Sequence, residues 1–71
     1  MTLIEAKQLR NGQVIYHATK KDSRGNPVRY KVTSVKTWKR NPERIEIGLK
    51  YGLYTYEKIG AEHLEHVNAQ R

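Results

Sequence analysis

This 71-residue chain has no cysteine, no phenylalanine and no long apolar run. Without cysteine, neither a disulfide nor a thiolate zinc site can stabilise the fold, and a reducing compartment is a natural setting. A membrane-spanning helix needs about 18 apolar residues, and a secretory signal needs an apolar segment near the N-terminus. The sequence has neither feature. We therefore expect a cytoplasmic protein that has no membrane partner.

Groups suited to catalysis or metal binding are also scarce. The chain has one aspartate and two serines, and it has no glycine-rich phosphate loop. His63 and His66 lie three residues apart, but without cysteine or a nearby aspartate they make a poor metal site. We interpret these two residues and His17 as surface or capping residues. A chain this small also has little room for a water-excluding pocket. We expect no enzyme, no metal and no cofactor.

What the chain has in excess is positive charge, and this charge is one-sided. The formal net charge is +7. Residues 7–40 carry +9, because ten basic side chains face one aspartate there, whereas residues 41–71 carry −1. Such a field attracts polyanions. The predicted partner is nucleic acid, either DNA or RNA, or an acidic surface on another protein. Both partners fit a basic protein, so charge alone does not separate them.

The hydrophobic pattern predicts a single domain over residues 1–71. Its parts are an N-terminal helical segment at residues 1–10 and a small β-barrel at residues 13–68. Thr2 and Glu5 have the spacing of a capping box, which favours a short helix in the first segment. A chain of this length buries only about 60% of the surface that its unfolded form exposes. Its stability margin is therefore thin.

Five strands are expected, and one of them is long. That strand, residues 28–39, exceeds the usual strand length, so we expect a bulge near Thr33-Ser34 that lets Val32 and Val35 both point inward. Residues 44–51 alternate apolar and polar side chains, which is typical of an antiparallel sheet with one wet face. The other strands are expected over residues 13–18, 53–59 and 65–68, with turns at 20–27 and 41–42 and one helical or 3-10 turn at 61–64.

Closing so small a sheet on itself removes its exposed edges, so the predicted fold class is a mainly all-β, five-stranded small barrel. The segment Leu9–Tyr16 reads L-R-N-G-Q-V-I-Y and resembles the opening L-x-x-G-x-x-V/I of SH3-like barrels of the Tudor and KOW types. Residues 59–67 resemble their ending, which is a strand, a short turn and a last strand. The resemblance implies an SH3-like fold but no activity, since such barrels bind DNA, RNA or protein. No Tudor-type aromatic cage can be assigned.

The middle of the chain carries a second resemblance. Residues 29–32, 36–40 and 51–54 are similar to small uncharacterised proteins of phage and prophage type. The likeness covers about residues 9–67. It implies a phage setting, and therefore a host cytoplasm, but again no activity.

The first candidate site is a tryptophan between two cations. Lys36, Trp38 and Arg40 are two residues apart, so they share one face of a strand. Such a tryptophan offers a platform on which bases stack, and the cations beside it contact phosphate. In the alternative interpretation, Trp38 belongs to the core at the bottom of the barrel and both cations are solvated.

The second candidate site is a pair of tyrosines. If Leu53 and Ile59 point inward, Tyr54 and Tyr56 point outward beside Lys58. Two exposed tyrosines on one face suit the binding of bases or of a protein groove. The alternative places both tyrosines in the core.

The third candidate is the basic turn at residues 20–27 with the strand that follows it. Flexible basic loops commonly bind phosphate, although they also serve only to keep a protein soluble. The predicted nucleic-acid site combines the three candidates: Lys20, Lys21, Arg24, Arg29, Lys31, Lys36, Trp38, Arg40, Tyr54, Tyr56 and Lys58.

Three functions remain open at this stage. The first is a non-enzymatic nucleic-acid-binding barrel with weak sequence preference, because no recognition helix for a major groove is expected. The second is a phage-type protein-binding module that docks on and modulates a host enzyme that handles nucleic acid. The third is a structural subunit of a larger assembly, for which the small core is the hint. Neither the strandedness of the nucleic acid nor the oligomeric state follows from the sequence.

Overall fold

The computed structural model describes residues 1–70, which form one sheet, one short helix and one 3-10 turn. The sheet has five antiparallel strands in the order β4-β3-β2-β1-β5. The predicted mainly-β class, the N-terminal helix and the helical turn before the last strand are confirmed. In chain order the elements are α1 (Leu3–Lys7), β1 (Val14–Lys21), β2 (Pro27–Trp38), β3 (Asn41–Tyr51), β4 (Thr55–Gly60), η1 (Ala61–His66) and β5 (Val67–Asn68).

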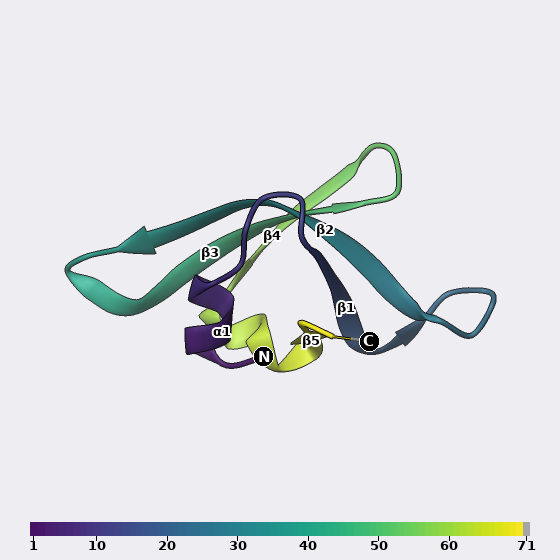
Figure 1. Cartoon of the computed structure of the whole chain (residues 1–71), viewed down its shortest axis with the longest axis horizontal. Coiled ribbons are helices and arrows are strands. Elements are labelled where there is room, and N and C mark those ends of the chain that lie inside the picture. Colours follow the sequence, from purple (N-terminus) through teal and green to yellow (C-terminus); the bar gives the residue numbers. More distant parts are fainter. Residues whose placement is uncertain (71) are drawn as a thin grey trace.

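The sheet is not closed into a barrel. Its two edges are β4 and β5, and within residues 1–70 these strands do not pair with each other. The predicted closure is therefore not confirmed. Figure 1 shows a long twisted sheet, with α1 and η1 next to each other below its middle and with the β1–β2 and β2–β3 hairpins extending to opposite ends. The molecule accordingly measures 42 × 22 × 16 Å.

Some element boundaries differ from the prediction. Strand β1 continues to Lys21, so the basic turn is reduced to residues 22–26. The β2–β3 turn lies at residues 39–40, because the pairing of Trp38 with Asn41 leaves only two residues to connect the strands. The predicted turn at residues 41–42 is therefore wrong, and these residues begin β3. Strand β4 starts two residues later than predicted.

The capping box at the start of α1 is confirmed. The backbone N–H of Glu5 donates to Thr2 Oγ1 at 3.1 Å, and the backbone N–H of Thr2 donates to Glu5 Oε1 at 3.0 Å. The hydrogen bond from the Thr2 backbone to the carboxylate favours its ionised form and is the largest cause that lowers the pKa of Glu5, followed by a hydrogen bond from the Thr2 side chain. Because α1 has only five residues, it also depends on docking, and Ala6 on its inner side is fully buried.

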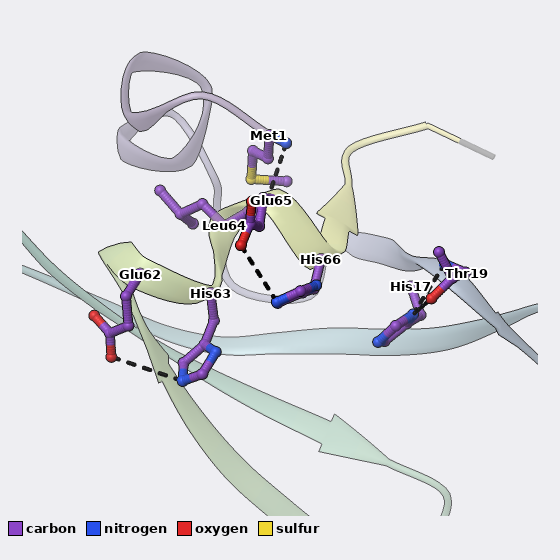
Figure 2. Close-up of polar contacts among 8 residues, drawn as sticks. All are labelled: Met1, His17, Thr19, Glu62, His63, Leu64, Glu65 and His66. Carbon is purple, nitrogen blue, oxygen red and sulfur yellow. Dashed lines mark hydrogen bonds and ion pairs between the residues drawn. The ribbon is translucent and has the colours of Figure 1, made fainter.

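The N-terminal amine connects the two short helical elements. The α-amino group of Met1 donates to the carbonyl oxygen of Leu64 at 3.0 Å (Figure 2) and to that of Val67, directly after η1, at 2.9 Å. The Leu64 carbonyl also accepts the backbone N–H of Val67. Because the last carbonyls of a helical turn carry partial negative charge, a cationic donor there is favourable.

The long strand β2 contains the predicted bulge. Its pairing with β3 shifts between Val32 and Ser34, so that Val32 lies opposite Leu49 and Val35 lies opposite Ile47. Both valines consequently point to the same side of the sheet, where Val32 is buried and Val35 packs against the core. Val32 and Val35 are three residues apart, and in a regular strand this odd spacing would place them on opposite sides of the sheet. The extra residue of the bulge keeps both on the core side.

Gly48 lies on β3 directly opposite this bulge, paired with Ser34. A Cβ atom at Gly48 would lie 2.5 Å from Ser34 Oγ and 2.7 Å from Thr33 Oγ1, so any side chain there meets the bulge. The position is buried even though it lies on the polar side of β3. Both hydroxyl groups lie at the ends of short exposed side chains, and the nearest backbone atom, Ser34 N, is 3.5 Å away, so the close approach favours glycine at this point of the strand.

The hydrophobic core lies on one side of the sheet only. It consists of inward residues from β1, β2 and β3 together with residues from the segment 1–10, from η1 and from β5. Within residues 1–70, no polar or charged residue is buried. The opposite side of the sheet is uncovered, and we call it the outer face. The core members are Ala6, Leu9, Ile15, Tyr30, Val32, Ile45, Ile47, Leu49, Leu64 and Val67.

Substitution of Gly48 by valine tests the contact between the bulge and β3. Valine has a high strand propensity, but here its side chain collides with Ser34 and Thr33, and overpacking typically costs about 1–3 kcal/mol. We expect a loss of stability of that size in urea denaturation. Glu43→Val, at an exposed position of the same strand, is the matched control and should change stability by less than about 0.5 kcal/mol. Equal stability of the two variants would show that the bulge does not need glycine.

Candidate nucleic-acid interface

The outer face of the sheet combines cations with aromatic side chains. Alternate residues of a strand point to opposite sides, and residues paired across strands point to the same side. Since Leu49 and its neighbours face the core, their alternates face outward. The resulting set is Tyr16 from β1; Arg29, Lys31, Lys36 and Trp38 from β2; Arg44, Glu46 and Lys50 from β3; and Tyr56 and Lys58 from β4.

One row of this face crosses four strands. Val14, Lys31, Lys50 and Tyr56 are aligned by the pairing of β1 with β2, β2 with β3 and β3 with β4. Two lysines thus lie directly opposite each other on neighbouring strands. The Lys50 Nζ lies 5.7 Å from the ring centroid of Tyr56, and that tyrosine is 64% exposed. This row offers two cations beside an accessible aromatic ring.

Trp38 lies among cations at the other end of the face. The guanidinium carbon of Arg44 is 4.0 Å from the centroid of the indole ring, and Lys36 Nζ is 5.1 Å from it. Trp38 is half-buried, and it is neither a core residue nor one that packs against the core. The interpretation of Trp38 as a core residue is therefore wrong. Its ring is already in contact with two cations, which it holds in place.

A shallow hollow opens beside the lysine row. Its volume is about 420 Å³, and its lining includes the cations Arg29, Lys31 and Lys50 and the carboxylate of Asp22. Tyr30 and Tyr51, whose ring centroids lie 5.9 Å apart, also belong to its lining. The hollow therefore combines three cations and one carboxylate with two tyrosines. Burial is the first cause that raises the pKa of Tyr30, so its hydroxyl stays protonated and available as a donor.

About half of the predicted site residues meet on the outer face. They are Arg29, Lys31, Lys36, Trp38, Tyr56 and Lys58. The others lie elsewhere: Lys20 and Lys21 at the end of β1, Arg24 in the β1–β2 turn, Arg40 in the β2–β3 turn and Tyr54 in the β3–β4 turn.

Two tyrosines of the second candidate are exposed, so the interpretation that places them in the core is wrong. Tyr54 is 89% exposed and Tyr56 is 64% exposed. The expectation that Leu53 points inward is also wrong, because Leu53 lies in the turn and is 76% exposed. Ile59 does pack against the core.

Arg44 and Lys50 belong to the outer face but were not predicted as site residues. Both lie in the segment 44–51, whose strict alternation identified its polar side. That alternation was the available signal. It was not sufficient, because the pairing of Lys50 with Lys31 and the contact of Arg44 with Trp38 require the register between strands.

The three histidines come together on the other side of the sheet. The ring centroids of His63 and His66 are 6.1 Å apart, and those of His66 and His17 are 6.4 Å apart (Figure 2). His63 and His66 are exposed, which agrees with their interpretation as surface residues, and β1 and η1 bring them into one row with His17. In residues 1–70, no group of three or more histidine, aspartate or glutamate residues could hold a metal ion.

The ring of His17 is fixed by backbone donors. Its Nδ1 accepts the N–H of Thr19 at 3.1 Å and the N–H of Lys20 at 2.9 Å. Partial burial is the largest cause that lowers the pKa of His17, followed by the charges of Lys20 and His66. The neutral ring, with its proton on Nε2, is therefore favoured.

No protein family, curated protein or solved structure matches this chain. In the part of the chain that the structure describes, no helix is long and apolar enough to cross a membrane.

Removal of the indole ring tests the placement of Trp38. We expect Trp38→Ala to fold cooperatively and to lose about 1–2 kcal/mol, which corresponds to two exposed cation–π contacts and some packing. Ile47→Ala, the core control, should lose about 2–5 kcal/mol. Chemical denaturation followed by circular dichroism measures both. A loss of about 3–5 kcal/mol in Trp38→Ala would instead indicate a core tryptophan.

The lowered pKa of His17 predicts a dependence of stability on pH. Between the folded pKa and the ordinary value of about 6.5, the unfolded chain binds more protons than the folded one. The contribution of the neutral ring is therefore complete above about pH 6.5, and it is lost as the pH falls toward the folded pKa. His17→Asn keeps an acceptor for the two backbone donors but cannot titrate. Urea denaturation from about pH 8 to pH 5 should show a smaller loss of stability in this variant, and equal losses would contradict the assignment.

Proposed function

We propose that this protein is a non-enzymatic nucleic-acid-binding domain and that the outer face of its sheet is the binding surface. The backbone phosphates would contact the cations of β2, β3 and β4, and bases would stack on exposed tyrosines. The proposal is supported by the position of the cations, which lie on the one side of the sheet that no helix covers. An acidic protein surface remains the alternative partner.

The observation that carries this proposal is the direct pairing of Lys31 with Lys50. Like charges opposite each other in a sheet are destabilising. The other charged pair of these two strands, Lys36 with Glu46, has opposite signs. A small domain with a thin stability margin has no structural reason to place two lysines together. A polyanion that contacts both of them supplies such a reason.

The mechanism would be phosphate neutralisation with weak sequence preference. Each contact with a phosphate releases a counterion, so affinity for duplex DNA should fall with a log–log salt slope of about −0.9 per phosphate. Trp38 would orient Arg44 and Lys36 toward phosphate, while the more exposed Tyr56 would stack on bases. No helix of more than six residues lies in residues 1–70, so the described part of the chain has no recognition helix for a major groove.

We also propose that the fold is SH3-like. The strand order β4-β3-β2-β1-β5 and the 3-10 turn directly before β5 support an SH3-like arrangement that is open between its edge strands. The phage setting and the cytoplasmic location stay predictions that no comparison tests.

A protein-binding module is the second candidate, and one observation favours it. Leu53 and Tyr54 at the β3–β4 turn are 76% and 89% exposed, beside the unpaired edge of β4. Exposed apolar and aromatic residues next to a free strand edge suit a protein partner. A Leu53→Ser, Tyr54→Ser double variant separates the two functions. If the lysine row is the main site, the variant should keep most of its affinity for nucleic acid. If the β3–β4 turn is the main site, the variant should no longer bind its protein partner.

Reversal of the charge at Lys50 tests the nucleic-acid proposal, because it should affect the stability of the fold and the affinity for an oligonucleotide in opposite directions. In Lys50→Glu, the unfavourable lysine pair becomes a favourable one, so the variant should be at least as stable as the original protein, by up to about 1 kcal/mol. It should nevertheless bind a fluorescent oligonucleotide about tenfold more weakly at low salt, because a charge-assisted hydrogen bond is worth about 1.5–3 kcal/mol. Single-stranded and duplex probes would define the preferred form.

The matched control is Lys7→Glu in α1. It changes the net charge by the same amount, but Lys7 is exposed on the opposite side of the molecule, on a helix. Binding should fall much less than in Lys50→Glu. Equal losses would mean that binding follows net charge and not the outer face, and that result would contradict the proposed surface.

A further inference from the structure

A second pocket lies on the covered side of the sheet. Its volume is about 340 Å³, and it opens between η1 and the strands β1, β2 and β4. The polar groups that line it come from four elements: His17 and Lys20, Tyr30, Glu57 and Lys58, and His63 with His66. Tyr30 is a core residue, and Lys58 belongs to the outer face, where its ammonium lies 3.5 Å from Glu46. Neither the core nor the outer face accounts for the other polar side chains.

His17 is a donor in this pocket and not a metal ligand. Because its Nδ1 already accepts two backbone N–H groups, the proton of the neutral ring lies on Nε2. A metal ligand needs an unprotonated nitrogen, which this ring does not offer there. The Nε2–H is therefore suited to an acceptor, such as the oxygen of an anion. The Lys20 ammonium, on the same strand and at the same pocket, adds a positive charge.

The remaining groups decide which anion fits. On η1, His63 Nε2 lies 3.7 Å from Glu62 Oε1 and His66 Nε2 lies 3.6 Å from Glu65 Oε1, in exposed pairs. Glu57 on β4 lines the pocket, and its charge acts on both His17 and Tyr30. An ionised carboxylate can only accept hydrogen bonds. It repels a fully deprotonated anion but accepts a proton from one that still carries a hydroxyl group.

We propose that this pocket binds a phosphate group that carries a hydroxyl, either inorganic phosphate or the terminal phosphate of a nucleotide. The Nε2–H of His17 and the ammonium of Lys20 donate to phosphate oxygens, and the phosphate hydroxyl donates to Glu57. Sulfate is excluded because it has no proton to donate at neutral pH. Because the second ionisation of a phosphate monoester lies near pH 6, binding of a nucleotide phosphate is stronger at pH 6 than at pH 8. Inorganic phosphate keeps a hydroxyl group at both pH values, so it can donate to Glu57 throughout this range.

The test is a titration of the full chain with inorganic phosphate at constant ionic strength. The imidazole signals are followed in proton–nitrogen NMR spectra, in which the neutral Nε2–H ring of His17 can be recognised. We expect saturable shifts of His17 and His66 with phosphate and none with sulfate. Sulfate shifts of the same size and midpoint would overturn the proposal. Thymidine 5′-monophosphate and thymidine then distinguish the sources: tighter binding of the nucleotide than of phosphate assigns a nucleotide end, and tighter binding of phosphate assigns the free ion.

Three variants locate the site. Lys20→Ala should weaken phosphate binding about tenfold, as the loss of one charge-assisted hydrogen bond implies. Lys21→Ala is the matched control, since Lys21 is exposed but does not line the pocket, and it should bind like the original chain. Glu57→Gln should reduce the preference for phosphate over sulfate. Equal effects of the two lysine variants, or an unchanged preference in Glu57→Gln, would overturn the proposal. Lys20, Lys21 and Glu57 do not belong to the outer face as defined above, so the effects of these variants are distinguishable from a failure of the nucleic-acid proposal.

Discussion

The bulge at Thr33–Ser34 is the constraint on which the rest of the structure depends. Lys31 and Lys36 are five residues apart, and in a regular strand an odd spacing would place them on opposite sides of the sheet. The extra residue places both on the outer face, opposite Lys50 and Glu46, and keeps Val32 in the core and Val35 packed against it. Gly48, opposite the bulge, has no side chain that would displace the hydroxyl groups of Ser34 and Thr33. The extra residue therefore defines the core and the charged surface together.

The short length of the chain explains why the sheet has two unlike sides. A five-residue helix and a six-residue 3-10 turn suffice to cover only one side of the sheet. These elements hold each other through the Met1 amine and the carbonyl oxygens at the end of η1. The uncovered side makes no contribution to the core, so its side chains are not constrained by packing. A surface of this kind can carry a binding function at little structural cost, which is why its composition is informative.

Much of the fold was predictable from the sequence because local patterns specify it. The capping box of Thr2 and Glu5 and the bulge in β2 both follow from spacing along a single element. The site was less predictable because it depends on which residues face each other across strands. Lys50 is one polar residue among several until its register opposite Lys31 is known. Likewise, His17 and His66 are 49 positions apart in the numbering, and only the pairing of β1 with β5 brings η1 to β1. The predicted closure of the barrel depends on the two edge strands meeting, which no local pattern determines.

The two charged pairs between β2 and β3 differ in how their charges are compensated. Lys36 faces Glu46, which also lies 3.5 Å from Lys58, so these charges compensate one another. Lys31 faces Lys50, and no carboxylate lies in that row from Val14 to Tyr56. The cost of this second pair falls on the free protein, and under the proposed function an anion bound between the lysines would relieve it. If such a ligand bound only the folded chain, it would also stabilise the fold. The pairing of Lys36 with Glu46 shows that β2 and β3 can pair with opposite charges facing each other. The repulsion is therefore specific to the position of Lys31 and Lys50.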